Sequence, residues 1–169
     1  MKRRFITPVV SALLVCALLF VSLLTAPVLA ADSYPFQTGD PEVTNALDYL
    51  RAQQSADGSI GSFGASAWVV MAIAAADEDP HDWRVSDNPS IVDYLATNAS
   101  SATSATDYAR MLLAITAADE DPTDFGGRDF VSLLESTFDG TQIGNSALLN
   151  DDFWGVMGLI DAGENPNSE

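Results

Sequence analysis

The chain has 169 residues, and its 24 acidic side chains outnumber its 7 basic ones, which gives a formal net charge of −17. So negative a surface repels nucleic acid and anionic membranes, and we expect neither as a partner. Apolar residues make up 47% of the chain, too many for a disordered protein. The composition predicts a folded acidic protein whose charges are best screened at high salt, as in a saline habitat.

The first 30 residues have the layout of an export signal. Residues 2–4 are basic and Val9 to Leu24 is almost wholly apolar. Val28 and Ala30 then place small side chains before a cleavage point at residue 31. An uncleaved anchor is the alternative, because about 20 apolar residues can cross a bilayer. We expect residues 1–30 to be a signal peptide and the protein to be secreted, extracellular or held at the cell surface.

Removal of this signal leaves about 139 residues, the size of one domain. Cys16 is the only cysteine, so the mature chain forms no disulfide. Its basic residues are then four arginines against 24 carboxylates, a net charge of about −20.

One six-residue segment occurs twice without change. Ala75–Pro80 reads Ala-Ala-Asp-Glu-Asp-Pro, and Ala117–Pro122 repeats it 42 residues later. Asp161–Pro166 is a degenerate third copy after another 44 residues, and an apolar run precedes each copy. We therefore predict a linker over 31–41, followed by a domain over 42–169 that contains three repeats. The repeats are expected at 42–83, 88–125 and 128–166.

Each repeat is predicted to form two helices. In the first helix of the first repeat, Val43, Ala46, Leu47 and Leu50 share one face of a 3.6-residue period. The second helices are apolar almost all round, over 67–76, 111–118 and 153–160. A helix of that kind is usually buried on all sides, so we expect an inner layer covered by the first helices. Each inner helix is expected to end at its Asp-Pro pair, because a residue before proline disfavours the α conformation.

The connection inside the first repeat carries a family resemblance. Tyr49–Gly61 reads YLRAQQSADGSIG and resembles the glutamine and Asp-Gly repeat of squalene cyclases and protein prenyltransferase β-subunits. Asp139–Gly144, DGTQIG, is a partial echo in the third repeat. In physical terms the glutamine can bond backbone groups at a helix end and the glycine permits a positive-φ turn, so the motif suits a scaffold.

The resemblance implies an all-α fold of the α/α-toroid type, in which outer helices surround inner helices and a central cavity. Judged from the family, a closed ring needs about twice the hairpins present here. The chain is then a fragment of a secreted archaeal or bacterial member, or a half-ring that stays open or self-associates. The superfamily also includes thioester domains and cobalamin carriers, so the fold alone does not fix the function.

The residues required for catalysis in the family are not matched. Its cyclases share an Asp-x-Asp-Asp proton donor, and the nearest segment here, Leu149–Asp152, departs from it at Leu149 and Asn150. Its prenyltransferases hold zinc with Asp, Cys and His, whereas the mature chain has no Cys and one His, His81. We predict no cofactor and no metal site, and we favour a protein that is not an enzyme.

A candidate ligand site follows from aligning the Asp-Pro turns. The alignment places chemically suggestive residues in register at the start of the second helices, where a toroid has the mouth of its cavity. Aromatic side chains with a polar rim suit a small, partly apolar ligand. The candidate residues are Trp68, Asp107, Tyr108, Arg110, Asp151, Asp152 and Trp154.

A purely structural interpretation of these residues stays open. Thr106 and Asn150 would be N-caps, and acids in the first turn of a helix favour its dipole. The tryptophans would belong to the core, and Arg110 would pair with Asp107 or another carboxylate.

Three functions remain at this point. The first is a secreted module that binds a small apolar ligand or a partner without catalysis. The second is a part of a terpene-cyclase-like or prenyltransferase-like enzyme whose catalytic half is absent from this sequence. The third is a structural repeat protein of the cell surface.

Overall fold

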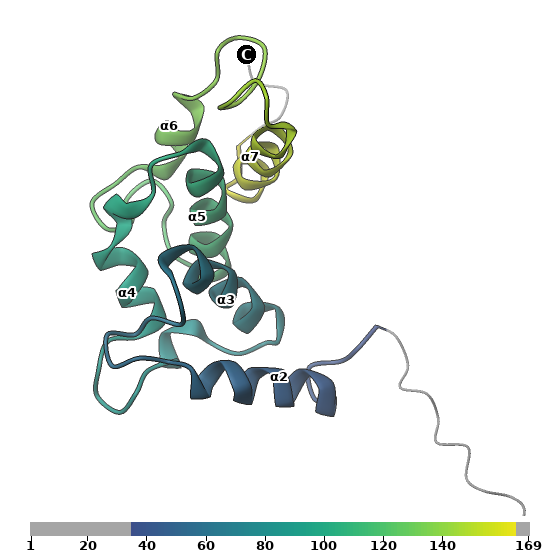
Figure 1. Cartoon of the computed structure of the whole chain (residues 1–169), viewed down its shortest axis with the longest axis vertical. Helices are drawn as coiled ribbons and strands as arrows, with labels where there is room; N and C mark the ends of the chain where they lie inside the picture. Colours follow the sequence, from purple (N-terminus) through teal and green to yellow (C-terminus); the bar gives the residue numbers. More distant parts are fainter. Residues whose placement is uncertain (1–34, 165–169) are drawn as a thin grey trace, which may run out of the picture. The chain divides into compact units, whose positions relative to one another are not determined.

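The computed structural model describes residues 35–164 of the chain. The predicted signal peptide, the start of the linker and the last five residues lie outside this range. The helices of the described part are α2 (Pro41–Ala52), α3 (Phe63–Ala75), α4 (Ile91–Thr97), α5 (Ala105–Ala117), α6 (Phe130–Glu135) and α7 (Leu149–Asp161) (Figure 1). Two single 3₁₀ turns, η1 (Pro80–Asp82) and η2 (Ala99–Ser101), lie between them.

The all-α prediction is confirmed for this range, which contains six α-helices and only isolated β-bridges instead of strands. None of these helices combines the length and the apolar character that a membrane span requires. The described helices all belong to the compact unit that begins at Gln37.

Helix α5 is the centre of the packing. It contacts α3, α6 and α7, while the closest helical partner of α4 is α3 (Figure 1). Its side chains Met111, Leu112 and Ile115 are fully buried. Burial of one such side chain contributes about 1.5–3 kcal/mol, so α5 contributes substantially to the stability of the core.

Helices α3, α5 and α7 match each other in length and in position along the chain. Each has 13 residues, and they begin at Phe63, Ala105 and Leu149. These starts have the same spacing, 42 and then 44 residues, as the Asp-Pro segments that follow the helices. A residue of α3 therefore has a counterpart in α5 and another in α7.

The three helices also end in the same way. The backbone N–H of Glu78 bonds Ile73 O at 3.2 Å, that of Glu120 bonds Ile115 O at 3.1 Å, and that of Glu164 bonds Leu159 O at 3.0 Å. The residue before each glutamate has a positive φ: 58° at Asp77, 57° at Asp119 and 90° at Gly163. This is the Schellman arrangement. The prediction that the Asp-Pro pair ends the helix was therefore wrong, since the left-handed residue ends it several residues before the proline.

The helix starts also differ from the prediction. The side chain of Ser104 caps α5, and Ser104 and Asp107 form a reciprocal capping box. Helix α5 thus begins before Thr106, which was expected to be the cap. Helix α7 begins at Leu149 without a side-chain cap, so Asn150 does not cap it either.

The glutamine and Asp-Gly motif holds the loop between α2 and α3. Gln54 Nε2 donates to Gly58 O at 3.1 Å and to Trp83 O at 2.6 Å. Gly58 has a φ of 91°, and a Cβ there would collide with the carbonyl oxygen of Ser90. A side chain is excluded at Gly58 both by its conformation and by this close approach, which agrees with a scaffold role for the motif.

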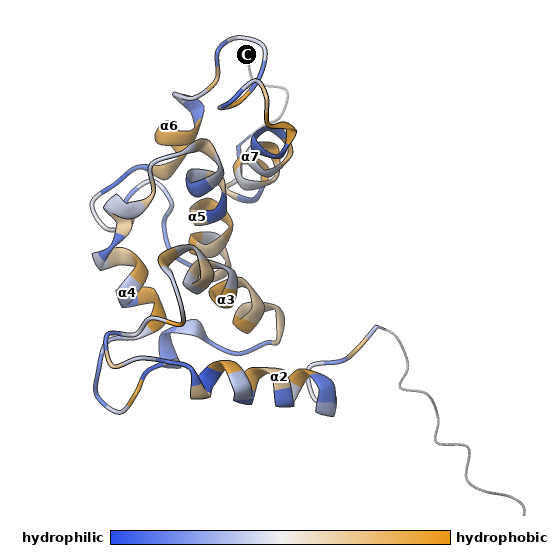
Figure 2. Ribbon diagram, viewed as in Figure 1, coloured by the Kyte–Doolittle hydropathy of each residue, from blue (hydrophilic) through white to orange (hydrophobic). Residues whose placement is uncertain are grey.

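One expectation about burial was wrong. Helix α7 is not buried on all sides, because four of its apolar side chains are about half exposed: Phe153 (51%), Val156 (48%), Met157 (49%) and Ile160 (51%). Figure 2 shows apolar residues on both α5 and α7. Of these two helices, α5 packs against three others, whereas the main partner of α7 is α5 alone. A helix that is apolar all round is buried only where enough neighbours exist to cover it.

Candidate ligand-binding site

The side chains of Trp68 and Trp154 meet. Trp68 belongs to α3 and Trp154 to α7, and their rings contact edge to face with centroids 5.1 Å apart. Phe153 lies next to Trp154, with ring centroids 5.6 Å apart. Trp68 is 41% exposed and Phe153 is 51% exposed, so this aromatic cluster is part of the surface. Exposed clusters of large aromatic rings are more frequent at binding sites than elsewhere on a surface.

Arg110 lies close to this cluster along the helices. A Cβ built on Gly64 of α3 would be 3.1 Å from the guanidinium carbon of Arg110, and Gly64 is one helical turn before Trp68. The absence of a side chain at Gly64 therefore leaves room for the arginine between α3 and α5. This contact gives Gly64 a specific role that sequence reasoning did not find.

Arg110 is also paired. Its Nη2 donates to Asp107 Oδ1, three residues earlier on α5, and both side chains are mostly buried, at 17% and 25% exposure. The buried Nε of Arg110 has no hydrogen-bond partner among the described residues. The ion pair supports the structural interpretation of the two residues, and the unpaired Nε is enclosed beside Gly64 of α3.

Several interactions act on the carboxyl group of Asp107. Burial raises its pKa, but hydrogen bonds from the Ser104 hydroxyl and from the backbone of Thr103, together with the charge of Arg110, lower it more. The net pKa of Asp107 lies below its ordinary value. Asp107 is therefore ionised at neutral pH and serves both as a helix cap and as the counter-ion of Arg110.

Asp151 and Asp152 attach the start of α7 to its surroundings. Asp151 is 4% exposed, accepts a hydrogen bond from Thr106 of α5, and accepts the backbone N–H of Asn145 at 2.9 Å. Asp152 accepts the backbone N–H of Ile143 at 2.9 Å. Protein donors thus engage both carboxylates, and both hold the loop that precedes α7.

Tyr108 points to a different neighbour. Its ring contacts Phe130 of α6 edge to face, with centroids 6.4 Å apart, and the guanidinium of Arg128 lies 5.6 Å from its centroid. The structure therefore joins the seven candidate residues in smaller groups: Trp68 with Trp154, Arg110 with Asp107, and Asp151, Asp152 and Tyr108 with partners outside the candidate set.

Sequence reasoning missed a cluster around Trp83. This residue is fully buried although it lies in a loop, and its Nε1 donates to Glu78 Oε2 at 2.8 Å. The same glutamate pairs with Arg51 of α2 at 2.6 Å, and the Arg51 guanidinium lies 4.1 Å from the Trp83 ring centroid. These three residues attach α2 to the turn after α3. The acidic turn after α3 therefore holds part of the fold.

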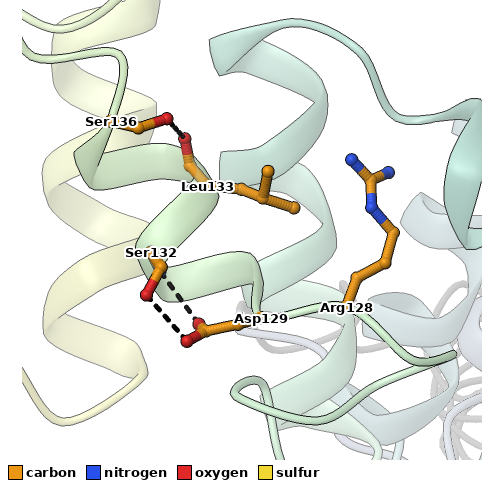
Figure 3. A pocket seen from close by; sticks show the side chains of 5 residues that line it. All are labelled: Arg128, Asp129, Ser132, Leu133 and Ser136. Carbon is orange, nitrogen blue, oxygen red and sulfur yellow. Dashed lines mark hydrogen bonds between the residues drawn. The ribbon is translucent and has the colours of Figure 1, made fainter.

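A surface hollow of about 420 Å³ lies beside α6 and is lined by Arg128, Asp129, Ser132, Leu133 and Ser136 (Figure 3). Its polar side chains already have partners: Ser132 donates to Asp129 at 2.7 Å and Ser136 donates to Leu133 O at 2.7 Å. Arg128 extends away from Asp129 and donates to the carbonyl oxygens of Ala99 and Ala102. The hollow offers a ligand few free polar groups.

Across residues 35–164, no group of three or more His, Cys, Asp or Glu side chains is placed to hold a metal ion. His81 contacts Ala118 O at 3.2 Å and Glu120 at 3.4 Å, so it links the turn after α3 to the turn after α5. Its neighbours explain its position without a metal.

Comparison with known proteins adds no relative: the chain matches no protein-family model, no curated protein and no solved structure.

Proposed function

We propose that the chain is an exported, non-catalytic helical-repeat protein of the α/α-toroid type, and that it binds a small, partly apolar ligand beside the paired indoles of Trp68 and Trp154. The observation that carries the proposal is the edge-to-face contact of two tryptophans from different helices, one of them 41% exposed. Folding alone favours burial of such large rings, whereas their display together at a surface favours recognition of an apolar group.

The polar part of the ligand would meet Arg110. The side chain of this residue is 17% exposed, its guanidinium carries N–H donors besides the one that meets Asp107, and the carboxylate of Asp107 already neutralises much of its charge. A neutral or singly charged anionic acceptor group on an apolar body fits this combination. Asp151, Asp152 and Tyr108 are left out of the proposed contact surface because protein groups engage them.

The toroid part of the proposal is supported by the packing of the helices. Helices α3, α5 and α7 have equal lengths, equal ends and matching spacing, while α4 and α6 pack on α3 and α5. Export is supported by the layout of residues 1–30.

The proposal is tested by titrating the protein with 8-anilinonaphthalene-1-sulfonate, a small apolar anion, by calorimetry. We expect Trp68→Ala and Trp154→Ala each to weaken binding at least about tenfold, the equivalent of 1.4 kcal/mol. Phe138→Ala is the matched control, since Phe138 is an aromatic residue that is 54% exposed after α6. Equal affinity in the wild type and both tryptophan variants, or an equal loss in Phe138→Ala, would contradict the proposed site.

A further inference from the structure

The exposed apolar side chains of α7 lie on one face. Leu149, Phe153, Val156, Met157 and Ile160 have exposures between 48% and 81%, and their spacing of four, three, one and three residues keeps them on the same side of the helix. Contiguous apolar surface of this kind usually has a partner in solution.

The counterpart of this face in α5 is covered. A shift of 44 residues relates Leu149, Phe153 and Val156 to Ala105, Ala109 and Leu112, which are buried. The covering element is α7 with its preceding loop. A Cβ on Gly158 would lie 3.1 Å from Ala109 O and 3.3 Å from the Leu112 Cβ, and a Cβ on Gly144 would lie 2.6 Å from the Ala105 Cβ. The exposed face of α7 therefore corresponds, residue by residue, to the face of α5 on which α7 packs.

Helix α3, the first of the three matching helices, carries the complementary surface. Helix α7 meets α5 through Gly158 and through hydrogen bonds of Asp151 and Asp161 to the threonines of α5. The counterparts of these three residues in α3 are Ala65, Ala72 and Ala75, and all three are exposed. Small side chains at these positions leave room for bulky ones opposite, as Gly158 leaves room for Leu112.

From this register we infer that the occupant of the α7 face is a second copy of this chain. Helix α3 of one copy packs on α7 of the other copy in the way that α7 packs on α5 within a copy. One chain carries both halves of this contact, so no other protein is required to complete it. The interface is heterologous, and two copies joined at both ends give a closed ring of six hairpins. This inference is argued from other observations than the proposed ligand site, but the two share Phe153, which lies on the α7 face and next to Trp154.

Salt should control the association. Each copy has a formal net charge of −17, so two copies repel each other, and this repulsion opposes the contact at low ionic strength. Because the Debye length falls from about 10 Å at 0.1 M to about 3 Å at 1 M salt, the apolar contact should prevail at molar salt.

The test is sedimentation velocity with the full chain, expressed with its own leader and purified, at 0.1 M and 1 M salt. We expect the wild type to sediment as a dimer at 1 M salt. Val156→Asp on the α7 face and Ala72→Glu on the α3 face should each be monomeric. Tyr49→Asp is the control. Tyr49 lies on α2 and is 67% exposed, and its replacement by aspartate adds the same charge away from both faces. Circular dichroism verifies folding, and Met157→Asp replaces Val156→Asp if the latter does not fold.

A mixture of the two variants identifies the head-to-tail arrangement. Val156→Asp retains an intact α3 face and Ala72→Glu retains an intact α7 face, so an equimolar mixture should form 1:1 dimers through a single interface, more weakly than the wild type. A monomeric wild type at molar salt would overturn the inference. So would an Ala72→Glu variant that dimerises like the wild type, since two α7 faces would then pack on each other.

Discussion

Arg110 and Asp107 form an ion pair within α5, and the Arg110 guanidinium lies against Gly64 of α3. The pair links the capping box at the start of α5 to the contact between two helices. A lone arginine at this partly buried position would be costly, so its counter-ion is part of the fold.

Loss of this pair should lower the free energy of unfolding. We expect Asp107→Ala to cost about 2 kcal/mol, since it removes a helix cap and leaves Arg110 without its counter-ion. Arg110→Met keeps the apolar stem and should cost about 1 kcal/mol. Urea denaturation measures both, with Asp124→Ala in an exposed turn as the control. Unchanged stability of Arg110→Met together with lost ligand affinity would show that the arginine serves the ligand instead of the fold.

The capping box of α5 should make stability depend on acid pH. A carboxyl group whose pKa is lower in the folded than in the unfolded protein stabilises the fold fully above its unfolded pKa, about 3.9, and this contribution is lost as pH falls through the folded value. The pKa of Asp107 is lowered, partly by the Ser104 hydroxyl. Ser104→Ala should therefore raise the pKa of Asp107 in an NMR titration. The stability difference from the wild type should shrink below about pH 4. A pKa of Asp107 that does not change would refute the role of Ser104, and Ser100→Ala in η2 is the control.

The left-handed residue that ends α5 is a site for stabilisation. Asp119 has a φ of 57°, a conformation that costs an L-residue free energy but not glycine, and the third helix already has Gly163 there. We expect Asp119→Gly to stabilise the protein by about 0.5–1 kcal/mol. Asp119→Ala removes the same charge without gaining this conformational freedom, and it should not be stabilising. Thermal denaturation of both variants tests this prediction. Equal melting temperatures of Asp119→Gly and Asp119→Ala would show that the stabilisation does not come from the conformational freedom of glycine.

Stability should rise with salt. The formal net charge of −17 implies repulsion within one molecule, which 1 M salt screens at distances beyond about 3 Å. The melting temperature should increase from 0.1 M to 1 M sodium chloride. The measurement belongs on the Val156→Asp variant, which is expected to be monomeric, so that association does not contribute. A melting temperature that stays constant would mean that the carboxylates are already compensated within the fold.

Sequence patterns predicted those features that depend on spacing. The recurrence of the Ala75–Pro80 segment gave the register of α3, α5 and α7, because helices of equal length between equal turns keep equal spacing. Local chemistry was less informative about boundaries. A serine two residues earlier competes with Thr106 as the cap, and a left-handed aspartate ends the helix before the proline acts.

The orientation of single side chains was beyond the sequence. Asp107 and Tyr108 are adjacent, so about 100° around the helix axis separates them, and one faces Arg110 while the other faces α6. Register places both at the same height without showing which neighbour each will meet. Trp83 was missed for another reason: a loop has no periodicity from which its burial could be predicted.

The central claim, that a ligand binds at the paired indoles, is tested most directly by the indole N–H signals in a nitrogen–proton NMR spectrum. The chain has three tryptophans, and each gives one indole signal. On addition of 8-anilinonaphthalene-1-sulfonate, we predict shifts of the Trp68 and Trp154 signals. The Trp83 signal, held by Glu78 in a buried site, should stay in place. Unmoved signals of Trp68 and Trp154 at saturating ligand would contradict the claim.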